Sequence, residues 1–321
     1  MPDTPHRLSL ERIDHAARVI DPVFLNSPQF VCEPLGDELG VRLVLKLETL
    51  NPIRSFKGRG ADFFMSTLDG LTPQPRLVCA SAGNFGQAMA FAARRRGLAI
   101  SIFAAETANP FKLERMRALG AELRLHGDDF DAAKLEAKRF AREAGARMVE
   151  DGLDPETAEG AGTMGLELLR LPDAPDVLLV PLGNGAMIGG VGRVIKAYRP
   201  STQVIAVQAA GAPAMTESWR SGRLVTHQRI DTIADGIGVR VPVPEALTDL
   251  RGLIDDALLV SDEATLRAMR LLHRHVGVVV EPSGAVGVAA LLEHPERMRG
   301  GRVGTLLCGG NLTLEQMRAW L

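Results

Sequence analysis

The lysine at position 57 is the side chain in this sequence with the clearest capacity for covalent chemistry. Lys57 lies between an aromatic residue and a glycine in the segment Ser-Phe-Lys-Gly-Arg-Gly-Ala, residues 55–61, where a helix is expected to start. Positive potential at a helix N-terminus favours the neutral form of an amine, and a neutral amine can form a Schiff base with an aldehyde cofactor such as pyridoxal phosphate. The alternative is a solvated surface lysine with Arg54 and Arg59 beside it.

A second motif, Ser-Ala-Gly-Asn-Phe-Gly-Gln at residues 81–87, connects an expected strand to an expected helix. Backbone N–H groups converge at such a turn and can hold a carboxylate. The side-chain amide of Asn84 can donate a hydrogen bond to a phenolate-like oxygen. The alternative is a turn in which glycine and asparagine only supply left-handed backbone geometry.

The third motif is glycine-rich and follows the apolar segment 176–182 directly. It reads Gly-Asn-Gly-Ala-Met-Ile-Gly-Gly, residues 183–190. A glycine-rich turn from a parallel strand into a helix binds phosphate through bare backbone N–H groups. The motif lacks the Lys-Ser/Thr ending of a P-loop, and it matches the dinucleotide pattern poorly, so a small phosphate monoester is favoured. The alternative is close packing of helix on strand through glycine.

The fourth motif, Leu-Leu-Cys-Gly-Gly-Asn at residues 306–311, ends the last expected strand. Cys308 is thereby placed at the carboxyl end of a sheet, where α/β proteins bind ligands. The alternative is that this cysteine is a small apolar filler. Two more glycine turns belong with these motifs, residues 234–238 and 281–285, and the second lies at an expected helix start.

Helical and extended segments alternate along the chain, which predicts an α/β fold. Helices are expected at residues 9–19, 88–96, 110–119, 130–144, 157–170, 264–275 and 283–292, and strands at 41–47, 76–80, 99–104, 121–125, 147–149, 176–182, 203–208, 257–260 and 304–307. Near-continuous Val/Ile/Leu strands predict two open, twisted, mainly parallel sheets with helices on both faces. We expect a large lobe from residues 1–70 and 151–321, with residues 71–150 inserted as a small lobe.

Composition excludes several classes of protein. The 321 residues carry a formal net charge of −2 and only 4% aromatic residues, which disfavours nucleic acid as a partner. The three cysteines are far apart and form no CxxC pair, so a zinc ribbon or disulfide framework is not expected. No apolar run reaches the length of a membrane span, and residues 1–10 contain no apolar signal segment. We expect a cytoplasmic protein without a membrane partner.

Taken in order, the motifs resemble those of the pyridoxal-phosphate-dependent serine/threonine dehydratase family, which has the tryptophan-synthase-β-like fold (fold type II). The resemblance covers residues 35–312. It implies pyridoxal 5'-phosphate between the two lobes, with Lys57 both as the catalytic residue and as the point of covalent attachment. The other residues that it implies for the cofactor are Phe56 and Gly236 on the two ring faces, Asn84 at the 3′-oxygen, Gly183, Asn184, Gly185, Ala186 and Met187 at the phosphate, and Cys308 at the ring nitrogen. Those implied for the substrate carboxylate are Ser81, Ala82, Gly83 and Phe85.

The activity that the resemblance implies is an ammonia-lyase, or dehydratase. It would convert a 3-hydroxy amino acid such as L-threonine or L-serine to a 2-keto acid and ammonia by β-elimination. The alternatives are a threonine-synthase-like or β-replacement enzyme of the same fold, an amino-acid racemase, or a non-catalytic cofactor-binding protein. A homodimer is also implied, because homodimers are usual in similar enzymes.

Three positions depart from the family pattern. Ala82 stands where racemising relatives carry a hydroxyl residue, which favours elimination over racemisation. Phe85 replaces a common histidine, so the pocket is expected to be more apolar there. The segment 207–214, where some relatives bind a divalent cation, contains no carboxylate, and we expect no metal site.

Overall fold

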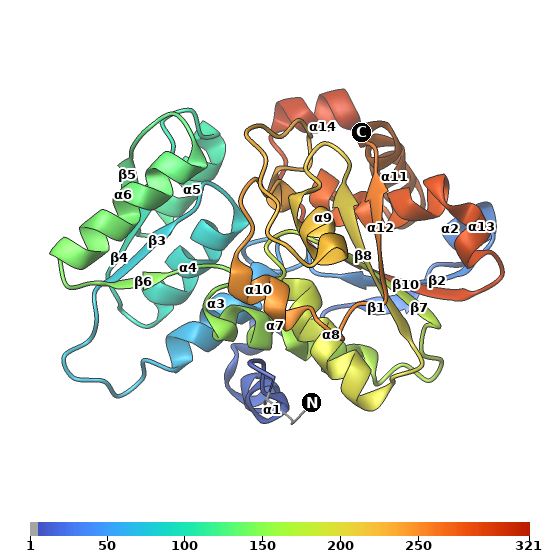
Figure 1. Cartoon of the computed structure of the whole chain (residues 1–321), viewed down its shortest axis with the longest axis horizontal. Coiled ribbons are helices and arrows are strands. Elements are labelled where there is room, and N and C mark those ends of the chain that lie inside the picture. The colour runs from blue at the N-terminus through green and yellow to red at the C-terminus, as the bar shows by residue number, and fades with distance from the viewer. Residues whose placement is uncertain (1–5) are drawn as a thin grey trace.

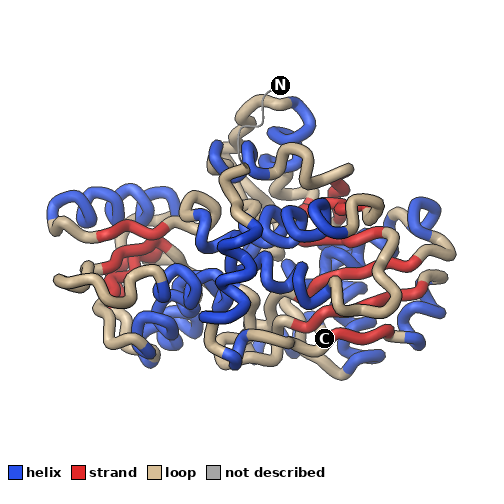
Figure 2. The backbone as a smooth tube through the Cα atoms, turned by 90° about the horizontal axis from the view of Figure 1, so that it is seen from below, coloured by secondary structure: helices blue, strands red, loops and turns tan. Residues whose placement is uncertain are grey.

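Two β-sheets, each covered by helices on both faces, organise the chain (Figure 1). The computed structural model describes residues 6–321, so the first five residues of the predicted large lobe lie outside the described part. Seen from below, the two sheets lie at opposite ends of the molecule with helices between them (Figure 2). Both sheets are mainly parallel, which confirms the predicted fold class.

The larger sheet has six strands in the order β1-β2-β10-β7-β8-β9. Their bounds are β1 Gln29–Val31, β2 Arg42–Leu47, β7 Val177–Pro181, β8 Gln203–Ala209, β9 Asp256–Val260 and β10 Arg302–Leu307. The edge strand β1 pairs antiparallel with β2, and the other neighbours are parallel. The carboxyl ends of all strands except β1 therefore lie at the same edge of the sheet, and helices and loops follow there.

Alternate side chains of the strands supply the two cores of this sheet, because successive strand residues face opposite sides. Leu178 and Val180 pack with helices α7, Pro155–Leu168, and α8, Ala186–Tyr198. Leu179 lies in the core on the opposite face, which α12, Pro282–Glu293, and α11, Asp262–Val276, cover. Residues 282–291 of α12 are all buried, as expected for a helix that is apolar all round.

The smaller sheet has four parallel strands in the order β5-β4-β3-β6. Their bounds are β3 Leu77–Ala80, β4 Ile100–Ala104, β5 Glu122–Leu125 and β6 Arg147–Val149. Helices α4, Asn84–Arg95, and α5, Pro110–Ala118, pack on one face, and α6, Phe130–Glu143, packs on the other. All four strands come from the segment predicted as the small lobe, whose exact bounds stay a prediction.

The remaining helices complete the layers around the larger sheet and between the sheets. Their bounds are α1 Leu10–Val19, α2 Glu33–Leu39, α3 Lys57–Ser66, α9 Ala214–Ser221, α10 Pro244–Asp249, α13 Pro295–Met298 and α14 Leu314–Trp320, with short 3-10 turns η1 Pro22–Phe24 and η2 Asp235–Ile237. Helix α3 packs against α7 of one layer and α4 of the other, and so lies between the two sheets. None of the helices within residues 6–321 is both long and apolar enough to cross a membrane.

Most predicted elements are confirmed within a few residues, and two differences are informative. Helix α4 begins at Asn84, four residues before the predicted start, so the glycine-containing motif itself forms the first helical turn. Strand β1 was not predicted, because its three residues are only half-buried or exposed and carry no apolar alternation. Its pairing comes from β2 and not from its own sequence pattern.

Candidate active site

All four motifs that could do chemistry lie just beyond the carboxyl ends of parallel strands. Lys57 begins α3 after β2, and Asn84 begins α4 after β3. Gly183 follows β7, and Cys308 follows β10 directly. Ligands of open α/β sheets bind outside these strand ends, so the two sheets together present one site between them.

Lys57 is the first residue of α3, as its motif predicted. Its Nζ lies 2.6 Å from Oδ2 of Asp151 and 4.6 Å from the centre of the Phe56 ring. The backbone N–H of Phe56 donates to the carbonyl oxygen of Cys308 at 3.0 Å, and the Ser55 hydroxyl donates to the same oxygen at 3.3 Å. These bonds fix the lysine turn to the end of β10, where the predicted cofactor residue Cys308 lies.

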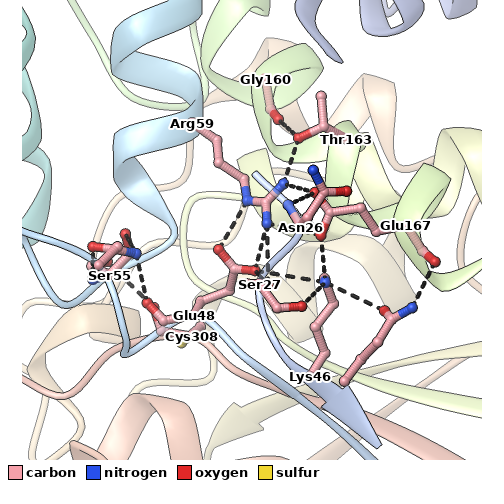
Figure 3. Close-up of polar contacts among 12 residues, drawn as sticks. Asn26, Ser27, Lys46, Glu48, Ser55, Arg59, Gly160, Thr163, Glu167 and Cys308 are labelled. Atoms are coloured by element: carbon pink, nitrogen blue, oxygen red, sulfur yellow. Dashed lines mark hydrogen bonds and ion pairs between the residues drawn. The ribbon is translucent and has the colours of Figure 1, made fainter. Parts of the chain in front are cut away.

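A buried cluster of charges holds the first turns of α3 in place (Figure 3). The guanidinium of Arg59 donates to Glu48 at 2.9 Å and to Glu167 at 2.6 Å. Lys46 Nζ donates to the other oxygen of Glu167 at 2.6 Å. Although burial opposes it, the Arg59 and Lys46 cations hold the pKa of Glu167 at about 2. The two cations and the two carboxylates thus neutralise each other. Arg59, one member of this cluster, is two residues from Lys57 in the chain.

Asn84 connects the small-sheet side of the site to the large-sheet side. Its amide donates to Oε1 of Glu281 at 2.6 Å, and its carbonyl oxygen accepts from the Asn311 amide at 2.8 Å. The second oxygen of Glu281 accepts from the backbone N–H of Asn311 at 3.1 Å. Burial raises the pKa of Glu281 to about 7, and the nearby Asp235 carboxylate adds to the rise. The Asn84 amide is therefore oriented by a carboxyl group that titrates near neutral pH.

The glycine-rich turn after β7 fits the predicted phosphate loop in its backbone geometry. Gly185 has φ +93°, a left-handed conformation that favours glycine, and it caps α8, which begins at Ala186. The first N–H groups of an α-helix have no acceptor within the helix and can bind an anion. A Cβ on Gly183 would lie 3.1 Å from the carbonyl oxygen of Gly236, so the loop and the Gly236 turn are adjacent.

Gly236 and Cys308 both lie next to Ser283, the second residue of α12. A Cβ on Gly236 would lie 2.8 Å from the Ser283 hydroxyl oxygen. The Cys308 thiol lies 3.5 Å from the Ser283 carbonyl oxygen, and burial raises the pKa of this thiol. The Ser283 hydroxyl is buried and has no hydrogen-bond partner among residues 6–321. A neutral thiol and an unpaired hydroxyl thus lie together where the resemblance places the cofactor ring.

The predicted substrate turn is held by its own serine. The Ser81 hydroxyl oxygen accepts from the backbone N–H groups of Gly83 at 3.2 Å and of Gly86 at 3.0 Å. Ala82 is half-buried, and the Phe85 side chain packs in the apolar core of the small sheet. The Phe85 side chain therefore faces the core, and what this turn offers a carboxylate is its backbone N–H groups.

Two carboxylates of this site, Asp151 and Glu281, were given no function by the sequence analysis. Asp151 follows β6 by two residues, so its place just beyond a strand end was the available signal. Glu281 stands immediately before α12 in the turn 281–285, where the sequence pattern indicates only a glycine turn. Their partners lie far away in the chain, and spacing alone does not reveal such contacts.

Comparison with known proteins identifies the family of the chain. The sequence profile of the family described as "Pyridoxal-phosphate dependent enzyme" matches residues 20–309. The chain belongs to this family. The match spans the lysine, asparagine and phosphate-loop motifs and includes Cys308 of the fourth motif. It confirms the family and the cofactor that the resemblance implied.

Relatives of this pyridoxal-phosphate enzyme cover nearly its whole length. An L-threonine ammonia-lyase from Thermotoga maritima is 34% identical over 311 residues, which cover 97% of this chain and 77% of the relative. Maize serine racemase superposes with a TM-score of 0.91 at 29% identity, covering 97% of this chain and 96% of the racemase. The processed form of threonine deaminase isoform 2 from Solanum lycopersicum gives a TM-score of 0.87 at 29% identity, covering 99% of this chain and 92% of the deaminase.

The residues present fit pyridoxal phosphate on three counts. Lys57 offers an amine at the edge of the site, and the turn 183–187 offers backbone N–H groups at a helix N-terminus. Gly236 carries no Cβ where one would press on Ser283, whose hydroxyl has no partner within the described residues. An amine for the aldehyde and backbone donors for the phosphate therefore lie within one site, with a glycine where the resemblance places one face of the ring.

Proposed function

We propose that this enzyme is an ammonia-lyase that converts a 3-hydroxy amino acid, such as L-threonine or L-serine, to a 2-keto acid and ammonia. Relatives named L-threonine ammonia-lyase at 34% and 36% identity support it. The observation that carries the proposal is the Cys308 thiol, which is buried with a raised pKa in the same site as the Lys57 amine.

Each predicted site residue has a place in this proposal. Lys57 would bind the aldehyde of the cofactor, with Phe56 and Gly236 at the two faces of the ring. Asn84, oriented by Glu281, would donate to the 3′-oxygen. The residues that would hold the phosphate through their backbone N–H groups are Gly183, Asn184, Gly185, Ala186 and Met187.

When bound, pyridoxal phosphate stabilises negative charge at the α-carbon of an amino acid. The Lys57 amine would be the base that takes the α-proton of a bound amino acid. Burial raises the pKa of the Cys308 thiol, so this side chain would stay neutral and would place no negative charge of its own beside the ring nitrogen. Without such a charge the ring is a weaker electron sink, which favours departure of a β-hydroxyl over transamination.

The substrate turn supports elimination over racemisation. The backbone N–H groups of residues 81–85 would bind the α-carboxylate, with Ser81 holding the turn through Gly83 and Gly86. Racemisation needs a second proton donor on the face opposite Lys57. Ala82 supplies no such donor at the position where racemising relatives carry a hydroxyl.

The test is release of keto acid and ammonia from L-threonine and from L-serine with no second nucleophile present. The proposal expects both products from the native enzyme and none from Lys57→Ala. Product that forms only when a second nucleophile is added would favour a β-replacement enzyme, and net formation of D-amino acid would favour a racemase. A spectral change on adding amino acids without any product would indicate a cofactor-binding protein and contradict the proposal.

The organisation of the molecule in solution completes the proposal. We propose two lobes, residues 1–70 with 151–321 and residues 71–150, as the pattern of strands and helices indicates, in a protein that is cytoplasmic by composition and a homodimer by resemblance. Light scattering after size exclusion would give the mass of the assembly. A mass near twice 34.5 kDa supports the homodimer, and a mass near 34.5 kDa contradicts it.

A further inference from the structure

The carboxylate of Asp151 lies next to the amine of Lys57. The proposed reaction has no role for a negative charge at this position. Its Oδ2 lies 2.6 Å from Lys57 Nζ and accepts from the side-chain amide of Asn184 at 3.3 Å. Asn184 belongs to the proposed phosphate loop, so Asp151 contacts two separate parts of the site. It approaches both from the loop after β6, in the chain segment that links the two sheets.

The second carboxylate oxygen of Asp151, Oδ1, stabilises no contact among the described residues. Oδ1 is buried and has no hydrogen-bond partner among residues 6–321, and the side chain is only 10% exposed. Neighbouring carboxylates are engaged elsewhere, since Glu150 pairs with two lysines of α6 and Asp154 with Arg147. A buried carboxylate oxygen without a partner is costly, which suggests that a ligand supplies the missing donor.

We propose that Asp151 selects the substrate by the charge and hydrogen-bonding capacity of the group on its β-carbon. This inference rests on the proposed function, because it takes Lys57 as the base at the α-carbon. A base must approach the α-carbon to about 3–3.5 Å, and the β-substituent is only two bonds further. Asp151, in contact with the same Nζ, is then within reach of that substituent.

Charge decides which substituents the site accepts. A hydroxyl or an ammonium group on the β-carbon can donate a hydrogen bond to Oδ1. A carboxylate at that position would meet a like charge in a buried site, where repulsion is poorly screened. Asp151 therefore admits neutral and cationic 3-substituted amino acids and rejects anionic ones. The substrate turn, residues 81–85, contains no basic residue that could offset this charge.

The test compares three amino acids that differ in the charge on the β-carbon: L-serine, L-2,3-diaminopropionate and L-threo-3-hydroxyaspartate. The variants are Asp151→Asn, which keeps the shape, and Asp151→Ala, which also opens the site. Asp173→Asn removes the same charge from an exposed residue that pairs with Arg42 and serves as the control. Two quantities are measured for each protein with each amino acid. They are kcat/KM for ammonia release and the dissociation constant from the change in cofactor absorbance.

Native enzyme and the Asp173 variant are expected to prefer the neutral and cationic compounds over the dicarboxylic one. In Asp151→Asn that preference should fall by roughly tenfold or more, with the cationic compound weakened and the anionic one strengthened. Asp151→Ala should show the same direction of change. The inference would be overturned if, in both variants, the ratios of kcat/KM and of dissociation constant between the compounds stayed within about twofold of the native ratios.

A second readout tests the contact without any turnover. In the cofactor-free protein, the Lys57–Asp151 pair must break before the amine can attack an aldehyde. Asp151→Asn is therefore expected to capture pyridoxal phosphate faster than the native protein, as followed by absorbance. Equal rates of capture would contradict the contact. If no amino acid is turned over, the proposed function fails, while the dissociation constants still test the charge selection by Asp151.

Discussion

The side-chain amide of Asn84 donates to Oε1 of Glu281 across 2.6 Å, and this bond joins the start of α4 to the start of α12. The two helices belong to the layers of different sheets. Glu281 is 3% exposed, and its burial raises the pKa to about 7. The residue that orients the proposed donor to the 3′-oxygen therefore changes its charge in the physiological range.

This raised pKa predicts a pH dependence of stability. A carboxyl whose pKa is about 7 when folded and 4.5 when unfolded stabilises the fold most below pH 4.5, where it is protonated in both states. Stability is then lost as the pH rises towards 7, because the unfolded chain ionises first. The loss is on the order of 3 kcal/mol in the free energy of unfolding.

Glu281→Gln removes this titration and should flatten the pH dependence of unfolding between pH 4.5 and 7. Urea unfolding of the cofactor-free protein at several pH values would measure it. Glu106→Gln makes the same chemical change at an exposed position and serves as the control. Parallel pH profiles for the native protein and the Glu281 variant would show that this carboxyl does not titrate as described.

The charge cluster beneath α3 predicts a large effect on stability. Arg59→Met would leave the carboxylates of Glu48 and Glu167 buried with only Lys46 to balance them. Removing one partner of a buried ion pair costs about 3–5 kcal/mol. The same substitution at Arg302, which forms an exposed pair with Asp176, should matter much less. Equal midpoints of chemical unfolding for the two variants would contradict the importance assigned to this cluster.

The missing Cβ of Gly236 predicts an effect on cofactor affinity. In Gly236→Ala the new carbon would lie 2.8 Å from the Ser283 hydroxyl, on the face assigned to the cofactor ring. The dissociation constant for pyridoxal phosphate should rise by roughly tenfold. Gly238→Ala is the matched control, since the nearest atom to its Cβ would be the flexible end of Ile230, at 3.0 Å, and the next would be the Asp235 carbonyl oxygen at an ordinary 3.5 Å. Titration of the cofactor-free variants, with equal affinities for both, would exclude a ring at Gly236.

The sequence predicted the parts of this site that depend on local pattern. A lysine at a helix start and a glycine turn after an apolar strand are each recognisable from a few consecutive residues. Lys57, Asn84 and Cys308 lie at the element ends that those patterns predict. The mainly parallel topology followed in the same way from buried strands with helical connections.

Contacts between distant segments could not be predicted in this way. Glu281 is 197 residues from Asn84, and Asp151 is 94 residues from Lys57, so no spacing rule joins them. The short edge strand β1 likewise depends on its partner β2. Phe85 was placed at the substrate by resemblance, but burial of its side chain in the small-sheet core is decided by packing.

The proposed chemistry depends above all on Lys57 as the covalent attachment point of the cofactor. Borohydride reduction of the cofactor-loaded enzyme, followed by proteolysis and mass spectrometry of the labelled peptide, locates that attachment directly. We expect a single reduced cofactor on Lys57, and no stable label in Lys57→Ala. A label on another lysine, or loaded enzyme that cannot be labelled at all, would show that Lys57 is not the attachment point.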